Sequence, residues 1–202
     1  MAELALVLWL IFGALAICGR AYLQYRRTGS TGLIGASGRI GSAEWLGGVV
    51  FGLAIAAGVA APILDLAGVL DPYEDLDTAT VQVAGILLYA IGLLATLAAQ
   101  LAMGASWRVG VDESERTELV TDGPFAIVRN PIYSAMIPTL TGIALLNPNP
   151  VSFGAVVLLI VALEMQTRLT EEPYLLAVHG DAYAEYAARV GRFLPGIGRI
   201  AS

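Results

Sequence analysis

The sequence predicts an all-α, polytopic integral membrane protein with about five transmembrane helices. Hydrophobic residues make up 57% of the 202 residues and charged residues only 14%, whereas about a quarter of the residues in soluble domains are charged. The apolar residues also gather in runs near the length that a helix needs to cross a hydrocarbon core of about 30 Å. In addition, every basic residue is an arginine, and the arginines lie in three groups between these runs.

The first three apolar runs, residues 2–23, 43–64 and 79–103, are each long enough for a full transmembrane helix. We expect them to form a three-helix membrane anchor over residues 1–103. Small residues recur at every fourth position of the second run, at Gly48, Gly52, Ala56 and Ala60. Such a stripe predicts that another helix packs closely against this face.

Two shorter apolar runs, residues 132–146 and 151–168, flank the uncharged sequence NPNP. At 1.5 Å per residue, the first of them would be only about 22 Å long as a helix. Pro138 lies inside it and favours a kink, because proline removes a helical hydrogen bond. We therefore expect the fourth and fifth membrane helices to form a short, tight hairpin.

The residues after the fifth run alternate between polar and apolar side chains. Between positions 172 and 190, the apolar and aromatic residues recur at helical spacing. Gly180 divides this stretch. The pattern predicts one or two amphipathic helices, interrupted near Gly180, on the cytoplasmic side of the membrane.

The distribution of arginine predicts the orientation of the chain. The groups are Arg20, Arg26, Arg27 and Arg39, then Arg108, Arg116 and Arg129, and last Arg168, Arg189, Arg192 and Arg199. Short loops that carry arginine stay in the cytoplasm, whereas the acidic segment 65–77 has no basic residue. Five spans then place the N-terminus outside and the C-terminus inside, in the cell (inner) membrane.

Several classes of site are excluded by residue types that the chain lacks. His179 is the only histidine and Cys18 the only cysteine, so we expect no metal site and no disulfide within the chain. No phosphate-binding P-loop or Rossmann glycine motif is present. The net charge of −6 also argues against a nucleic-acid partner.

Polar residues cluster where the fifth run ends. Glu164 and Arg168 lie four residues apart, and Glu171 and Glu172 follow directly. Ionisable groups near membrane depth are costly, and they are usually paired or functional. The cluster could be a salt bridge that anchors the helix end, or its adjacent carboxylates could be the counter-charge for a cation.

Two segments carry a resemblance to a known family. They are TELVTDGPFAIVRNPIYSAM, residues 117–136, and RLTEEPYLLAVHGDAYAEYAARVGRFLP, residues 168–195. In this order and separation they resemble the isoprenylcysteine carboxyl methyltransferase and phospholipid methyltransferase family. The resemblance implies one membrane domain over residues 1–202, in which residues 104–202 bind S-adenosylmethionine and carry out methyl transfer.

The resemblance also implies the residues of the site. The expected cofactor-binding residues are Glu118, Leu119, Val120, Phe125, Asn130, Pro131, Tyr133 and Glu171, and the expected catalytic residues are Arg168 and Glu172. Arg168 and Glu172 have the spacing of one helix face, so we expect them to pair and leave Glu171 for the ammonium group of the cofactor. Asn130 stands where the family usually has histidine. We therefore expect it to bind rather than to transfer protons.

Two other functions are compatible with the sequence. Membrane sterol reductases have a similar Arg-His-Pro-x-Tyr segment and use NADPH, but a phosphate-bearing dinucleotide should attract basic groups rather than an acid pair. The chain could also be a non-catalytic scaffold or transporter subunit. For a methyltransferase, we expect a lipophilic small-molecule acceptor that enters from the membrane lipids. The fold does not determine its identity or the atom methylated.

Overall fold

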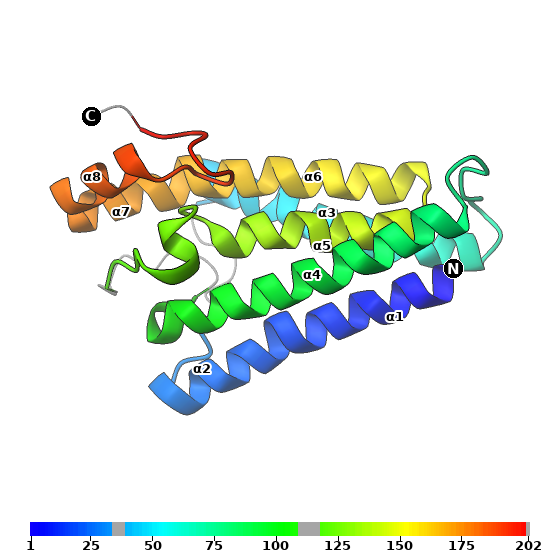
Figure 1. The fold of residues 1–202 in the computed structure, drawn as a ribbon, viewed down its shortest axis with the longest axis horizontal. Coiled ribbons are helices and arrows are strands. Elements are labelled where there is room, and N and C mark those ends of the chain that lie inside the picture. The colour runs from blue at the N-terminus through cyan, green and yellow to red at the C-terminus, as the bar shows by residue number, and fades with distance from the viewer. Residues whose placement is uncertain (34–38, 109–117, 201–202) are drawn as a thin grey trace.

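The structure is a computed structural model that describes residues 1–33, 39–108 and 118–200. Arg116, from the second predicted arginine group, lies outside the described residues. Within these ranges every named element is a helix, and the chain forms an elongated bundle (Figure 1). The all-α fold class predicted from the sequence is confirmed.

The helices of the bundle lie side by side along its long axis (Figure 1). They are α1 (Ala2–Phe12), α2 (Arg20–Thr28), α3 (Ala43–Leu66), α4 (Ala79–Met103), α5 (Pro131–Leu146) and α6 (Pro150–Gln166), followed by α7 (Glu172–His179) and α8 (Asp181–Arg189). A π-helical segment, Gly13–Gly19, joins α1 to α2, and another, Thr167–Glu171, joins α6 to α7. The remaining elements are short 3-10 turns at Gly104–Ser106 and Gly123–Ala126.

The N-terminus lies at one end of the bundle, and α2, α7, α8 and the C-terminus lie at the other (Figure 1). This is the arrangement expected if α1, α3, α4, α5 and α6 cross the bundle in turn. The predicted break near Gly180 is also present, because α7 ends at His179 and α8 begins at Asp181.

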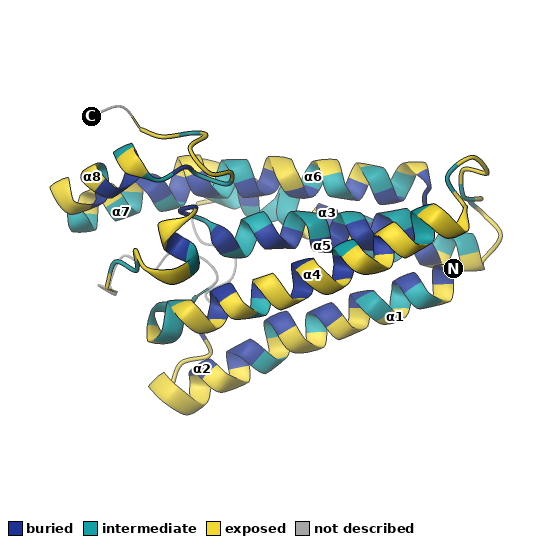
Figure 2. Ribbon diagram, viewed as in Figure 1, coloured by how far each residue is buried: buried dark blue, intermediate teal, exposed yellow. Residues whose placement is uncertain are grey.

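Four helices are long and apolar enough to cross a membrane: Ala2–Thr28, Ala43–Leu66, Ala79–Ser106 and Pro150–His179. The fifth apolar helix, Pro131–Leu146, is shorter. Large apolar side chains point outward from these helices, and exposed residues follow the outer faces of α1 and α4 (Figure 2). A bilayer would cover such surface, so the chain is an integral membrane protein.

One part of the predicted hairpin is wrong. The fourth span is short, as expected, but the fifth does not end near residue 168. It continues through the π segment to His179. The polar residues after position 166 do not end the helix, because the widened turn keeps the backbone hydrogen-bonded across them.

The centre of the bundle is the contact between α4 and α5, which depends on glycine. A Cβ atom at Gly92 would lie 2.4 Å from Thr139 Oγ1, and one at Gly142 would lie 2.5 Å from the carbonyl oxygen of Gly85. Backbones this close leave no room for a side chain. In a bilayer there is no hydrophobic driving force between helices, so their association depends on van der Waals contacts of this kind.

The small-residue stripe predicted in the second run is only partly buried, with Gly48 and Ala60 half-buried. Gly52 and Ala56 are exposed, whereas Gly47 and Gly58 of the same helix are buried. A Cβ atom at Gly58 would lie 2.2 Å from the ring of Trp9. The close contact between α1 and α3 therefore forms on a face rotated away from Gly52 and Ala56, where the indole of Trp9 packs on Gly58.

We expect Gly92→Ala to lower the free energy of unfolding by about 1–3 kcal/mol, the usual cost of overpacking a tight contact. Titration with a denaturing detergent, followed by circular dichroism, would measure it. Gly52→Ala is the matched control, because no atom lies within 4 Å of its added Cβ. Equal destabilisation by the two variants would contradict the proposed role of the α4–α5 contact.

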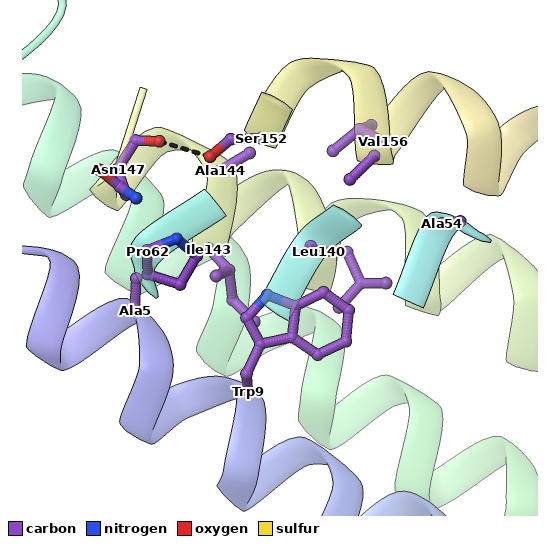
Figure 3. A pocket seen from close by; sticks show the side chains of 12 residues that line it. Ala5, Trp9, Ala54, Pro62, Leu140, Ile143, Ala144, Asn147, Ser152 and Val156 are labelled. Atoms are coloured by element: carbon purple, nitrogen blue, oxygen red, sulfur yellow. Dashed lines mark hydrogen bonds between the residues drawn. The ribbon is translucent and has the colours of Figure 1, made fainter. Parts of the chain in front are cut away.

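A small cavity of about 10 Å³ lies near the opposite end of the bundle from α7 and α8, between Trp9, Pro62, Leu140 and Asn147 (Figure 3). Beside it, Ser152 Oγ donates a hydrogen bond of 2.6 Å to the carbonyl oxygen of Asn147. A volume of about 10–15 Å³ is needed to hold one water molecule. This cavity is therefore a packing feature and is too small for an organic ligand.

Candidate functional site

A cavity of about 360 Å³ opens at the end of the bundle that carries α7 and α8. All the predicted cofactor-binding residues line it, and so does Glu172: they are Glu118, Leu119, Val120, Phe125, Asn130, Pro131, Tyr133, Glu171 and Glu172. The segments that supply them are the stretch before α5, the start of α5 and the end of the long helix that contains α6 and α7. The structure therefore brings together residues up to 54 positions apart along the chain.

Arg168 is the predicted site residue that does not line this cavity. Its side chain is 56% exposed and forms an ion pair with Glu164, one α-helical turn earlier. The predicted pairing of Arg168 with Glu172 is wrong. The spacing rule behind it assumes 3.6 residues per turn, whereas Thr167–Glu171 forms a π turn with hydrogen bonds between residues five apart. Thr167, and not Arg168, then lies above Glu172.

Glu172 instead forms ion pairs with two arginines, Arg129 and Arg192. Its Oε1 atom accepts hydrogen bonds from Arg129 Nη2 at 2.6 Å and from Arg192 Nε at 2.8 Å, and its Oε2 atom accepts one from Arg192 Nη2 at 2.8 Å. The carboxylate is buried, and the Arg129 side chain is only 2% exposed. A buried carboxylate with this many donors is held in one position and is not available as a mobile base.

Arg129 also ties the site to the end of the chain. Its Nη1 atom donates to the carbonyl oxygens of Ala187 at 2.9 Å and Val190 at 2.5 Å, and its Nη2 atom donates to that of Gly198 at 3.0 Å. The planar guanidinium group has several donors in a fixed arrangement, so one side chain can serve all these acceptors. The arginine of the RNPIY sequence therefore fixes α8 and the C-terminal segment against the cavity.

The backbone before α5 binds the same segment. The amide of Arg129 donates to the carbonyl oxygen of Gly191 at 2.8 Å, and the amide of Asn130 donates to that of Arg192 at 3.1 Å. The side-chain amide of Asn130 also donates to the Arg192 carbonyl, at 3.2 Å. Asn130 thus lines the cavity, but its amide nitrogen contacts protein.

Glu171 lines the same cavity as Glu172 but has a different partner. Its Oε1 atom accepts a hydrogen bond of 2.5 Å from the hydroxyl group of Tyr133. Neighbouring side chains of an α-helix point in directions about 100° apart, so two adjacent carboxylates can reach different partners. Glu171 is held by a neutral donor in this contact, whereas Glu172 is held by two cations.

Aromatic residues form much of the remaining wall. The guanidinium carbon of Arg108 lies 5.0 Å from the centre of the Tyr174 ring, and both residues line the cavity. In α8, burial, together with the nearby Glu172 carboxylate, raises the pKa of Tyr183 to about 12. Burial likewise raises the pKa of Tyr186 to about 12. Both phenols are therefore neutral at physiological pH.

Several lining residues come from the part of the chain that the sequence assigns to the membrane anchor. They include Ile17, Glu44, Phe51, Gln100 and Met103. Sequence reasoning missed them because they belong to apolar runs without a motif. It also missed Arg192, although this arginine lies within the second quoted segment. Among the residues that the structure describes, no group of three or more His, Cys, Asp or Glu side chains is placed to hold a metal ion.

Comparison with known proteins identifies the family. Residues 80–182 match the family model described as phospholipid methyltransferase. The chain belongs to the phospholipid methyltransferase family. The matched range runs from the start of α4 into α8, so it contains Arg129, Glu171 and Glu172. The family resemblance expected from the two segments is confirmed.

A plant protein is similar over a comparable stretch. Protein-S-isoprenylcysteine O-methyltransferase B of Arabidopsis thaliana is 28% identical over 113 residues. This stretch is 55% of the present chain and 57% of the plant protein. The chain thus matches little more than half the length of this relative.

Proposed function

We propose that the protein transfers a methyl group from S-adenosylmethionine to a lipophilic acceptor at the cytoplasmic face of the membrane. One observation carries the proposal: Glu171, Tyr133 and the start of α5 line one cavity of about 360 Å³ in a chain of the phospholipid methyltransferase family. The carboxylate, the aromatic ring and the helix N-terminus match three different parts of this cofactor.

The fit of the residues to the cofactor follows from their chemistry. A carboxylate such as Glu171 forms a strong, charge-assisted hydrogen bond with an ammonium group. The first turn of α5 has backbone amides without intrahelical partners and attracts a carboxylate group. The rings of Phe125 and Tyr133 offer faces for a planar base or a cationic sulfonium. These groups would hold the two charged ends of the amino acid part and the purine.

When bound, S-adenosylmethionine supplies an electrophilic methyl group on a positively charged sulfur atom. The contribution of the protein would then be alignment, because holding two reactants in line can replace much of the entropy cost of their encounter. Glu172 holds Arg129 and Arg192, and Arg129 holds α8 and the C-terminal segment against the cavity. An acceptor that is already an anion needs no base, whereas an amine acceptor has to release a proton.

The charges of the cavity argue against an NADPH-dependent reductase. Four carboxylates line it, at Glu44, Glu118, Glu171 and Glu172. Of the two arginines that line it, Arg129 is held by Glu172 and by backbone carbonyls, and Arg108 lies over the ring of Tyr174. A site for the 2′-phosphate of NADPH would instead need arginine donors directed into the cavity. Family membership supports the methyltransferase hypothesis over both the reductase and the scaffold.

Calorimetry on the purified protein in detergent tests the proposal. We expect S-adenosylmethionine and its demethylated product, S-adenosylhomocysteine, to bind at one site, and we expect excess NADPH not to displace them. Tight binding of NADPH, with no binding of either sulfur compound, would favour the reductase. No binding of any of the three would favour the scaffold.

The acceptor is proposed to enter from the bilayer. Apolar residues of three membrane helices, including Ile17, Phe51 and Met103, line the cavity. They suit an isoprenoid or acyl chain equally well. Incubation of membranes with methyl-labelled cofactor, followed by profiling of labelled lipids and small molecules, would separate a prenylated acid from a phospholipid amine.

We propose that the C-terminus and the cavity face the cytoplasm of a cell membrane and that the N-terminus is outside. In a Cys18→Ser background, a membrane-impermeant thiol reagent applied to intact cells should label Asp75→Cys but not Glu185→Cys. Both positions are exposed, and they lie in the α3–α4 loop and in α8. Labelling of Glu185→Cys in intact cells would reverse the orientation.

A further inference from the structure

We propose that Arg20 and Gln24, in the N-terminal helix, are positioning residues that hold the Trp107–Arg108 wall of the cavity. Both lie outside residues 80–182, the range that matches the family model. The inference rests on the proposed function, because its effect is expected on cofactor binding.

The first step is the burial of Arg20. Its side chain lies where the π segment Gly13–Gly19 meets α2, and the residue is only 2% exposed. Among the residues described, no carboxylate forms an ion pair with it. A buried cation without an anionic partner is costly, so its other contacts must compensate for the lost hydration.

Within the described part of the chain, the hydrogen bonds of Arg20 are with Gln24 and with Gly104, the first residue after α4. Arg20 Nη2 donates to the carbonyl oxygen of Gly104 at 2.5 Å, and Nη1 donates to Gln24 Oε1 at 3.0 Å. Gln24, 4% exposed, donates from Nε2 to the carbonyl oxygen of Ala105 at 2.6 Å. The last carbonyls of a helix carry partial negative charge, so a cation is stabilised there.

The same guanidinium group also covers Trp107, the residue that follows the 3-10 turn Gly104–Ser106. Its carbon atom lies 4.6 Å from the centre of the Trp107 ring, close enough for a cation–π contact. Trp107 is buried, and Ser106, Trp107 and Arg108 all line the cavity. Arg20 therefore holds the Gly104 carbonyl and the indole of Trp107 without itself lining the cavity.

A second contact ties the two helices together one turn away. Gln100, which also lines the cavity, donates from Nε2 to the carbonyl oxygen of Ala16 at 2.9 Å. Ala16 belongs to the π segment Gly13–Gly19, in which the α-helical hydrogen-bond pattern is interrupted. Three buried polar side chains thus fix the end of α4, and the direction of the chain after it, to the N-terminal helix.

This arrangement places a function in a part of the chain that otherwise resembles a membrane anchor. The wall continues from Trp107 to Arg108, which lies over Tyr174 of α7. If the wall shifts, the shape of the cofactor cavity changes, although neither Arg20 nor Gln24 lines it. Remote contacts of this kind change ligand affinity by about three- to thirtyfold.

The experiment compares Arg20→Met, Arg20→Lys and Gln24→Leu with Arg26→Met, an exposed arginine of the same helix that contacts only Tyr22 among the described side chains. Two quantities are measured: the Kd of S-adenosylhomocysteine, and amide hydrogen exchange over residues 104–108. We expect Arg20→Met and Gln24→Leu to weaken binding by about three- to thirtyfold and to accelerate exchange in this segment. Arg20→Lys should fall between these variants and the parent, since lysine keeps the charge but loses the planar donors.

Arg26→Met should behave as the parent. A parental Kd for both Arg20→Met and Gln24→Leu would overturn the proposal, even with faster exchange, because the contacts would then stabilise only the helix end. Equal weakening by Arg26→Met would also overturn it, as a general effect of charge. If the parent binds neither S-adenosylhomocysteine nor S-adenosylmethionine, the proposed function fails. Faster exchange in Arg20→Met and Gln24→Leu, confined to residues 104–108, would still show that these side chains hold the Trp107–Arg108 wall.

Discussion

Replacing Glu172 with leucine is expected to lower the free energy of unfolding by about 3–5 kcal/mol, the cost of leaving buried charges without their partner. Arg129 and Arg192 would both lose the carboxylate on which they converge. The expected consequence for the site is release of α8 and the C-terminal segment, and with it loss of cofactor binding. Detergent titration and calorimetry measure the two effects.

Glu164→Leu is the matched control, because it removes a carboxylate of the same long helix whose partner is the exposed Arg168. An exposed ion pair contributes only about 0–1 kcal/mol. Glu172→Gln keeps the shape and one acceptor oxygen, so its stability should lie between that of Glu172→Leu and the parent. If Glu172→Leu were no less stable than Glu164→Leu, Glu172 would not be the centre of the buried network.

Features that depend on local sequence were predictable. The predicted run 43–64 corresponds to the helix Ala43–Leu66. This helix begins where the Ser42 side chain accepts a hydrogen bond from the amide of Trp45. The run 132–146 became Pro131–Leu146, with proline at its first position. Run length, capping residues and proline placement all act within a few residues, so a single sequence contains the information.

The partners of the charged residues were not predictable in the same way. Arg129 meets Glu172 across 43 positions of sequence, and Arg192 meets it across 20. Such pairs are decided by how the helices pack. The π turn at Thr167–Glu171 has no residue signature that distinguishes it from an α turn, yet it places Thr167 rather than Arg168 in hydrogen-bonding register with Glu172. The spacing rule for α-helices therefore gave the Glu164–Arg168 ion pair correctly but failed for Arg168 and Glu172, between which the π turn lies.

The motif-based part of the site was predicted because its residues lie in two short segments. The residues that close the cavity from the membrane side, such as Glu44 and Gln100, are single polar positions in apolar helices. Nothing in their local sequence distinguishes a lining residue from one that faces lipid. Only the rotation of each helix in the bundle decides this, and side-chain fit such as that of Trp9 on Gly58 sets the rotation.

The second large effect is expected at Glu171. Glu171→Gln keeps the size of the side chain and its ability to accept a hydrogen bond from Tyr133, but it removes the charge proposed to face the ammonium group of the cofactor. A charge-assisted hydrogen bond contributes about 1.5–3 kcal/mol, so the affinity for S-adenosylmethionine should fall by roughly ten- to a hundredfold. Stability should change little, because Glu171 takes no part in the Arg129–Glu172–Arg192 network.

The controls for Glu171→Gln separate this effect from a change in overall charge. Glu185→Gln removes an exposed carboxylate of α8 and should bind the cofactor as the parent does. Arg168→Lys should also bind normally, because Arg168 lies outside the cavity and pairs with Glu164, and its turnover decides whether Arg168 belongs with the catalytic residues. A Glu171→Gln variant with parental affinity would show that the ammonium group has another partner. Glu118, the other predicted acid of the cofactor site, would then be the carboxylate to replace next, because it lines the same cavity.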